Sequence, residues 1–399
     1  MHPLPPNPEM RALRVHLVKV LKDAEALRSD SVERAFQSVP RHVFLPEADP
    51  SDAYSDTAVV TKWRNGRPVS SASQPRIVAE MLEQLDIKRG MRILEIGTGT
   101  GYNAALLAHL SGPQNVVTVE IDPELSQSAY SNLQKIGYGQ VMMIQGDAAD
   151  LAHSIGRFDR IIVTVGAWDI LPSWVEALSP KGKIVVPLSL NGIQCTSSFE
   201  KAGKYLKSSS VNTGGFMTME GLNAGPRVTA SANDGSTVLH EWPESLPDQL
   251  LYSLLDRTTK RIQVAELKEG YADGSLPFLY FFALNGYRIM QLLGSSPALV
   301  CIDPACEVAF RFPGNSVAEG WLMCESGRKT IKDFLRMYRD WLSLSAPSIA
   351  DVAIRAEMLP EHRPGEARVR RIGEHVYEVE KAHFRYEFTY PQNHGDLNA

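Results

Sequence analysis

The chain has 399 residues, which is long enough for two domains that each bury a hydrophobic core. Charged residues make up 22% of it and hydrophobic residues 44%, a composition typical of folded globular proteins rather than disordered ones. The formal net charge of −5 does not indicate nucleic-acid binding, and no apolar run approaches the length of a membrane span. The segment 1–8 lacks the charged and apolar regions of a signal peptide, so we expect a cytoplasmic protein with no membrane partner.

Helices are predicted at the start of the chain. Apolar residues follow helical spacing up to about Asp30, and the segment 31–40 is typical of a second short helix that ends at Pro40. We therefore expect a helical lead-in before the first strand.

A third helix is predicted after Ser73. Pro75 and an apolar-periodic run over 76–85 follow this serine closely. A serine in this position is a good N-cap, with the proline in the first helical turn. The residues alone thus predict Ser73 as a helix cap, which does not exclude a second role.

A glycine-rich segment over 92–102 reads Arg-Ile-Leu-Glu-Ile-Gly-Thr-Gly-Thr-Gly-Tyr. A short apolar strand ends there in three alternate glycines and opens into a helix, so the backbone can approach a ligand closely. The dinucleotide fingerprint requires a small residue three places after Gly99, where this chain has Tyr102. Glu95 suits a ligand with an ammonium and a sulfonium group better than a pyrophosphate. The spacing therefore favours S-adenosylmethionine over NAD or FAD.

Carboxylates near the ends of the next two predicted strands support this cofactor. The strand 116–121 contains Glu120, which can accept hydrogen bonds from both ribose hydroxyls. The strand 141–144 leads to Asp147, which can accept a hydrogen bond from the adenine amino group. The alternative is a tight turn with acids that only cap helices, and the combination of all three features favours the cofactor.

Two further strands are predicted over 158–163 and 183–188. Strands and helices alternate from the glycine run onward, which predicts a doubly wound parallel sheet.

The chain beyond Gly225 has a mixed pattern that predicts an α+β domain. The apolar residues between 331 and 342 are typical of a helix, and a second helix is predicted over 249–255. Strands are predicted over 278–284, 298–302, 308–312, 351–356 and 376–388. The basic group Arg368, Arg370 and Arg371 fits a solvated strand face, or else a contact with an acidic peptide.

The four cysteines are few and irregularly spaced for so long a chain. They are Cys195, Cys301, Cys306 and Cys324. This usage does not indicate a disulfide framework, and Cys301 with Cys306 lacks the tight pairing of a zinc site. We expect buried thiols and no metal centre.

Several segments together resemble one known family. In chain order they are 39–46, 53–56, 70–75, 94–102, 158–164 and 178–187. Their order and residues resemble the protein-L-isoaspartate O-methyltransferase family over residues 30–220. The resemblance implies a Rossmann-like class I methyltransferase fold, S-adenosylmethionine as methyl donor, and a peptide or protein substrate with an aspartyl or isoaspartyl residue.

The resemblance also implies site residues. The family's usual active-site residue is the serine that ends a Thr-Ile-Ser segment, and Ser73 matches it while Ser71 replaces the threonine. Ser73 is therefore our candidate catalytic residue. The preceding loop over 61–70 is longer, more basic and more aromatic than in the repair enzymes, which indicates a different substrate choice. The predicted cofactor-binding residues are Ser71, Glu95, Gly97, Thr98, Gly99, Gly101, Tyr102, Glu120, Asp147 and Ala148.

Three parts of the chain are predicted. They are a helical lead-in with the active-site loop (1–75), the S-adenosylmethionine-binding methyltransferase domain (76–224), and a C-terminal α+β domain for peptide recognition (225–399). The repair enzymes normally lack such an extension. A family branch found with ribosomally made, lanthipeptide-like peptides has one, together with a segment that resembles Ser70 to Pro75.

This branch implies a specific reaction, which is methylation of an aspartyl side chain in a modified peptide and passage through a succinimide to isoaspartate. Repair of isoaspartyl residues in damaged proteins is the alternative. A scaffold that binds S-adenosylmethionine without methyl transfer is a third hypothesis, which the full set of site residues disfavours.

Overall fold

The computed structural model describes residues 7–151, 155–226, 228–231, 237–240, 260–263, 277–293, 298–302, 309–313, 321–324, 328–362 and 367–391. The contacts between residues divide the chain into two compact units. The first unit comprises Met1–Leu188, Thr196–Ser210 and Gly214–Ala224, and the second comprises Ser189–Cys195, Val211–Thr213 and Gly225–Ala399.

The first unit begins with the predicted helical lead-in. Its elements are α1 (Pro8–Asp23), α2 (Asp30–Ser38), the 3-10 helix η1 (Arg41–Phe44) and the short α3 (Pro50–Ala53). Side chains cap the two longer helices, because Asn7 accepts hydrogen bonds at the start of α1 and Ser29 accepts one at the start of α2. A two-stranded hairpin of β1 (Val59–Arg64) and β2 (Arg67–Ala72) follows.

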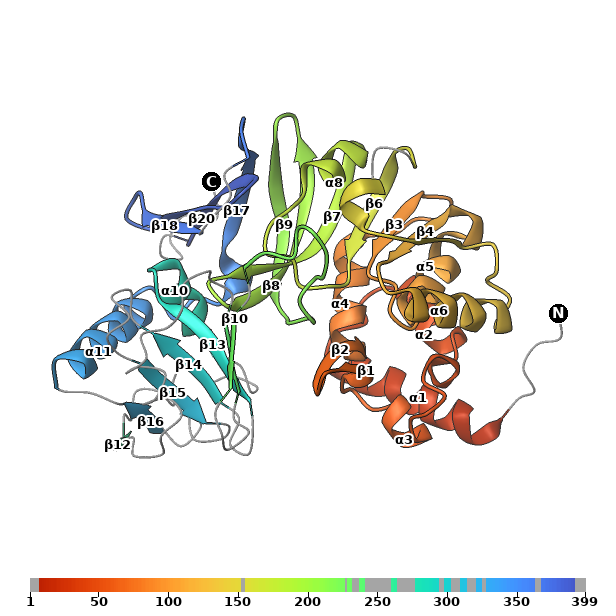
Figure 1. The fold of residues 1–399 in the computed structure, drawn as a ribbon, viewed down its shortest axis with the longest axis horizontal. Helices are drawn as coiled ribbons and strands as arrows, with labels where there is room; N and C mark the ends of the chain where they lie inside the picture. The colour runs from red at the N-terminus through yellow and green to blue at the C-terminus, as the bar shows by residue number, and fades with distance from the viewer. Residues whose placement is uncertain are drawn as a thin grey trace. The chain divides into compact units, whose positions relative to one another are not determined.

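The centre of the first unit is a parallel sheet. Its parallel strands are β3 (Ile93–Ile96), β4 (Val116–Glu120), β5 (Met142–Gln145), β6 (Phe158–Val163) and β7 (Leu178–Leu190). The strand order is β7-β6-β3-β4-β5, and β8 (Ile193–Ala202) and β9 (Tyr205–Thr213) continue the sheet beyond β7 (Figure 1). The chain runs outward from β3 in one direction and then in the other, so the topological switch point lies between β3 and β6. The predicted doubly wound fold is confirmed.

Helices connect these strands. They are α4 (Pro75–Leu85), α5 (Tyr102–Ser111), η2 (Pro113–Asn115), α6 (Pro123–Lys135), α7 (Ala148–Leu151) and α8 (Pro172–Ala177). The strands β3 and β4 are buried along their whole length, which explains why their sequences are almost continuously apolar.

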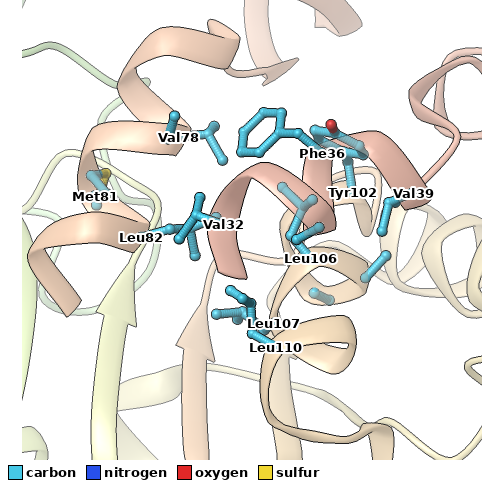
Figure 2. Packing of buried hydrophobic residues seen from close by; sticks show 14 of the residues in the cluster. Val32, Phe36, Val39, Val78, Met81, Leu82, Tyr102, Leu106, Leu107 and Leu110 are labelled. Carbon is cyan, nitrogen blue, oxygen red and sulfur yellow. The ribbon is translucent and has the colours of Figure 1, made fainter. Parts of the chain in front are cut away.

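A hydrophobic core joins the lead-in to the parallel sheet. Figure 2 shows residues of α2, α4 and α5 that pack together in it, among them Phe36, Leu82 and Leu106. Tyr102 makes edge contacts with Phe36 and Phe44, with ring centroids 6.3 and 5.6 Å apart. The large residue that replaces a small one after the glycine run therefore packs against the N-terminal helices.

The second unit is an α+β unit, as predicted. Antiparallel strands form one sheet, whose order within the described residues is β10-β11-β13-β14-β15-β16-β12. These strands are β10 (Val228–Ser231), β11 (Thr237–His240), β12 (Lys260–Gln263), β13 (Arg288–Leu293), β14 (Ala298–Ile302), β15 (Ala309–Pro313) and β16 (Trp321–Cys324). Four more strands pair in the order β18-β19-β20-β17. They are β17 (Ala353–Met358), β18 (Arg368–Arg371), β19 (Val376–Glu380) and β20 (Phe384–Thr389).

Helices of the second unit include α10 (Phe278–Leu284), α11 (Arg328–Ser343) and the 3-10 helix η5 (Ile349–Asp351). The predicted helix between 331 and 342 is confirmed as part of α11. The prediction of a strand over 278–284 is wrong, because this segment forms α10. All seven of its residues are buried, so it has no polar face that would reveal a helical period.

Two other predictions for this unit concern a strand over 376–388 and a helix over 249–255. The single strand expected over 376–388 is wrong, because the chain turns after Glu380 and forms the antiparallel hairpin β19–β20. The helix expected over 249–255 lies outside the described residues. Cys195 and Cys301 are buried and form no disulfide within the part of the chain that the structure describes, and Cys306 lies outside it.

Candidate active site

The glycine run forms a loop between β3 and α5. Gly97, Gly99 and Gly101 have φ angles of +94°, +54° and +90°, which side-chain-bearing residues rarely adopt. A Cβ atom on Gly97 would lie 2.8 Å from Cγ1 of Val165, so the loop also approaches the end of β6 closely. This loop lies at the carboxyl ends of β3 and β6, at the switch point where open α/β sheets bind ligands.

A cavity lies at this point in the first unit. Its lining comes from the hairpin, the start of α4, the glycine loop, the start of α5, the ends of β4 and β6, and the segment 216–220. The predicted residues that line it are Ser71, Ser73, Gly97, Thr98, Gly99, Tyr102 and Glu120. Glu95, Gly101, Asp147 and Ala148 do not line it.

Glu120 lies at the carboxyl end of β4 with its carboxylate held by the backbone. One oxygen accepts a hydrogen bond from the Gly99 amide at 2.8 Å, and the other accepts one from the Asp122 amide at 3.0 Å. Burial raises the pKa of Glu120, and these backbone hydrogen bonds act in the opposite direction. The carboxylate is thus fixed beside the glycine loop, where a diol ligand can be bound.

Glu95 lies underneath the loop rather than at the cavity wall. It is completely buried in β3 and accepts hydrogen bonds from Asn103 at 2.8 Å and Thr118 at 2.6 Å. Burial raises its pKa to about 7, although both hydrogen bonds lower it. Glu95 therefore ties β3 to β4 and α5 from below.

Asn103 is a candidate site residue that the sequence analysis missed. It lines the cavity from the first turn of α5 and donates its amide group to Glu95. Its side-chain oxygen Oδ1 is buried and has no hydrogen-bond partner among the described residues. A buried acceptor without a partner is costly, and the ammonium group of S-adenosylmethionine would satisfy it. The residues present at the cavity thus fit this cofactor.

Asp147 follows β5 and binds backbone amides on two sides. Its carboxylate accepts hydrogen bonds from Ala149 at 2.9 Å and from Leu222 at 3.1 Å. It thereby attaches the segment after residue 214 to the end of β5. Its predicted contact with adenine stays a prediction.

The Ser73 side chain does not cap α4, contrary to the prediction from local sequence. The N-cap of this helix is Gln74, which makes no side-chain cap hydrogen bond. The carboxylate of Asp56 takes that role, because it accepts hydrogen bonds from the Arg76 amide at 2.8 Å and from Gln74 Nε2 at 3.2 Å. The Ser73 hydroxyl has no hydrogen-bond partner among the described residues and lines the cavity.

The segment over 61–70 forms most of the β1–β2 hairpin. Lys62 binds Asp122, with its Nζ 2.7 and 2.6 Å from the two carboxylate oxygens. Arg64 lines the cavity and binds both Asp122 at 2.8 Å and Glu220 at 3.1 Å. Burial would raise the pKa of Asp122, and the hydrogen bond from Lys62 and the neighbouring backbone amides lower it below its ordinary value. These ion pairs hold the hairpin over the cavity.

The fold and this site define a class of protein: a Rossmann-like, S-adenosylmethionine-dependent methyltransferase. The family model of protein-L-isoaspartate(D-aspartate) O-methyltransferases matches residues 12–223. The chain therefore belongs to the protein-L-isoaspartate O-methyltransferase family, whose enzymes take the methyl group from S-adenosylmethionine.

Individual relatives agree with this assignment. The chain is 41% identical over 180 residues to the protein-L-isoaspartate O-methyltransferase of Methanopyrus kandleri. The matched region covers 45% of this chain and 77% of the relative. The chain is also 41% identical over 171 residues to protein-L-isoaspartate O-methyltransferase 1 of Archaeoglobus fulgidus, covering 41% of this chain and 77% of the relative.

One solved structure resembles more than the first unit. It is a protein-L-isoaspartate O-methyltransferase with a TM-score of 0.50 and 22% identity, and the similarity covers 86% of this chain and 96% of that one. The likeness in fold therefore extends into the second unit. The role expected for residues 225–399 in peptide recognition stays a prediction. Among the described residues, no helix is long and apolar enough to cross a membrane.

Proposed function

We propose that this protein transfers a methyl group from S-adenosylmethionine to the free carboxylate of an isoaspartyl residue in a peptide or protein. The observation that carries the proposal is the Ser73 hydroxyl, which lines the cavity beside the glycine loop and is not used to cap its helix. In this position it can donate a hydrogen bond to one oxygen of the acceptor carboxylate.

The reaction requires positioning more than acid or base catalysis. The cofactor supplies a methyl group bound to a positively charged sulfur. The neutral thioether that remains after methyl transfer is an excellent leaving group. The acceptor is ionised at neutral pH, so no base has to remove a proton from it. Orientation of the acceptor oxygen and exclusion of water then supply most of the reduction in the barrier. Ser73 orients the acceptor, and the hairpin with Lys62 and Arg64 covers the cavity.

Cofactor contacts are part of the same proposal. Glu120 would accept hydrogen bonds from the ribose hydroxyls, and the Asn103 Oδ1 atom would accept one from the ammonium group. The backbone of Gly97 and Gly99 would leave room for close approach of the cofactor. Because Glu95 is buried under the loop, we propose that it acts through Asn103 rather than by direct contact.

A second candidate function concerns the substrate. The exposed Trp63, with 62% of its surface accessible, lies on the hairpin that also carries the cavity-lining Ser71 and leads into Ser73. An aromatic side chain there favours a substrate that is recognised beyond its reacting residue. This feature supports methylation of an aspartyl side chain in a modified, lanthipeptide-like peptide, with residues 225–399 as its recognition domain.

Methylation assays test the proposal. The full chain is incubated with S-adenosylmethionine and a linear isoaspartyl peptide, and peptide mass is followed. One hydrogen bond to a charged group contributes about 1.5–3 kcal/mol, so Ser73→Ala is expected to lower kcat by roughly 10- to 100-fold. Affinity for S-adenosylhomocysteine is expected to stay the same in this variant. An unchanged kcat in Ser73→Ala would exclude the proposed role of this hydroxyl, and methylation of a cyclic aspartyl peptide alone would favour the second candidate.

A further inference from the structure

Arg41 is a buried cation directly beneath the segment that carries Ser73. It belongs to η1 and is only 1% exposed. Its Nε atom donates a hydrogen bond to the Ala53 carbonyl at 2.9 Å, and its Nη2 atom donates one to the Ser73 carbonyl at 3.0 Å. The same Nη2 atom lies 3.5 Å from the Ala72 carbonyl. The guanidinium thus connects the lead-in to the end of β2.

The surroundings of Arg41 do not neutralise it by an ion pair. Among the described residues its hydrogen bonds go to backbone carbonyls, and its guanidinium lies over the ring of Tyr102, whose centroid is 4.9 Å from Cζ. Its Nη1 atom is buried and has no acceptor among these residues. Burial lowers the pKa of Arg41, and the electrostatic interactions with Tyr102 and with the Asp56 carboxylate act in the opposite direction. A guanidinium nevertheless stays protonated in a protein, so a full positive charge lies here.

The segment that carries Ser73 is held from a second direction by Asp56. This carboxylate binds the side chain of Gln74 and the amide of Arg76. Arg41 therefore binds the carbonyls of Ala72 and Ser73, and Asp56 binds the side chain of Gln74 and the amide of Arg76. The serine is left with a fixed backbone and a free hydroxyl.

A buried charge of this kind has an electrostatic consequence. In a low-dielectric interior a cation acts over several ångströms with little screening. The acceptor in the proposed reaction is a carboxylate that must bind next to Ser73. A positive charge under this segment favours an anion there, although Arg41 itself does not line the cavity.

We propose that Arg41 is a positioning residue of the methyl transfer. It holds the Ala72–Ser73 backbone so that the hydroxyl faces the cavity, and its charge favours binding of the anionic acceptor. The expected effect on kcat and KM rests on the proposed function. The effect on the backbone around Ser73 can be measured without turnover.

The matched control for Arg41 is Arg160. This arginine is also buried and binds backbone carbonyls at the C-terminal end of α4, those of Leu85 at 2.6 Å and Asp86 at 3.2 Å, whereas Arg41 binds the segment just before α4. Arg160→Met therefore reports the general cost of removing a buried guanidinium that binds backbone carbonyls next to this helix. Arg41→Met removes the same chemical group at the end beside the cavity, and Arg41→Lys retains only the charge.

The experiment compares the full-length variants in two measurements. Hydrogen exchange of residues 70–78 is expected to become at least ~10-fold faster in Arg41→Met and to stay unchanged in Arg160→Met, because a lost buried hydrogen bond frees this segment. With an isoaspartyl peptide, Arg41→Met is expected to lower kcat by roughly 10- to 100-fold and to raise KM. Arg41→Lys is expected to restore KM more than kcat, while affinity for S-adenosylhomocysteine stays the same.

The outcomes are distinguishable. Unchanged exchange in Arg41→Met would overturn the positioning role, whatever the activity. An equal loss of S-adenosylhomocysteine affinity and of kcat would overturn it as well, because Arg41 would then support the whole site. Absence of turnover in the wild-type protein would contradict the proposed function, and the exchange measurement would still decide the role of Arg41.

Discussion

The buried Glu95 is expected to make the free energy of unfolding depend on pH. Its pKa in the folded protein is about 7, against the ordinary value of 4.5, because it is completely buried. Between these two values the folded protein binds more protons than the unfolded chain, so the free energy of unfolding falls as the pH rises. Each tenfold change in proton affinity corresponds to about 1.4 kcal/mol. The expected loss between pH 4 and pH 8 is therefore about 3 kcal/mol from this group.

The substitution Glu95→Gln isolates this contribution. Glutamine keeps the shape and the hydrogen bond from Thr118 but cannot ionise. We expect the variant to gain about 3 kcal/mol relative to the wild type as the pH rises from 4 to 8, because effects of all other groups cancel in the comparison. Hydrogen exchange of Ile93–Ile96, measured for both proteins at each pH, gives the opening free energies. A difference that stays constant over this pH range would refute the reasoning.

Three further substitutions test other parts of the structure. Gly97→Ala is expected to weaken S-adenosylhomocysteine binding by about 10-fold or more, because a Cβ would lie 2.8 Å from Val165 and the backbone has a φ of +94°. An unchanged affinity in calorimetry would disprove this expectation. Arg64→Met is expected to weaken S-adenosylhomocysteine binding by roughly 2- to 5-fold and to make this binding less dependent on salt. Arg67→Met, on the same hairpin, is the control, and it is expected to change neither the affinity nor its salt dependence. Phe278→Ala is expected to lower the stability of the second unit by about 3–5 kcal/mol in urea unfolding, because this fully buried ring contacts five other aromatic side chains of its core. A loss below roughly 1 kcal/mol, the size of a surface change, would contradict that packing.

The parallel sheet is the part that sequence predicts best. Buried strands are rich in apolar β-branched residues, and β4 and β6 begin and end within a residue of their predicted bounds. The strand β7 is longer than predicted, because the pairing with β6 shifts between Leu178 and Lys183. Residues 179–182, which lie between these two positions, resemble a turn in sequence but lie within β7.

Contacts between distant residues account for the errors near the site. Ser73 has the local signals of an N-cap, yet Asp56, 17 positions earlier in the chain, binds the helix start instead. Local sequence carries no information about that carboxylate. The same holds for Arg41, whose partners come from α3 and the end of β2. The segment over 61–70, expected as a loop, forms a hairpin instead. The dipeptide Asn65-Gly66 is a sequence signal for such a turn, and its residues have φ angles of +53° and +75°.

The second unit shows the limit of periodicity. The helix α11 has one apolar and one polar face, so its period is visible in the sequence. The helix α10 is apolar on all sides, and its run of aromatic residues is equally typical of a buried strand. In the structure Phe278 of α10 packs against Phe334 and Tyr338 of α11, contacts between distant residues that local sequence does not reveal.

The most direct test of the proposed function is a comparison of two peptides that differ in a single linkage. The full-length protein is incubated with S-adenosylmethionine and either an isoaspartyl peptide or the same peptide with normal aspartate, and both are followed by mass spectrometry. The account predicts that only the isoaspartyl peptide gains one methyl group and then loses methanol as the succinimide forms. Methylation of the aspartyl peptide alone, or of neither peptide by a protein that binds S-adenosylhomocysteine, would contradict it.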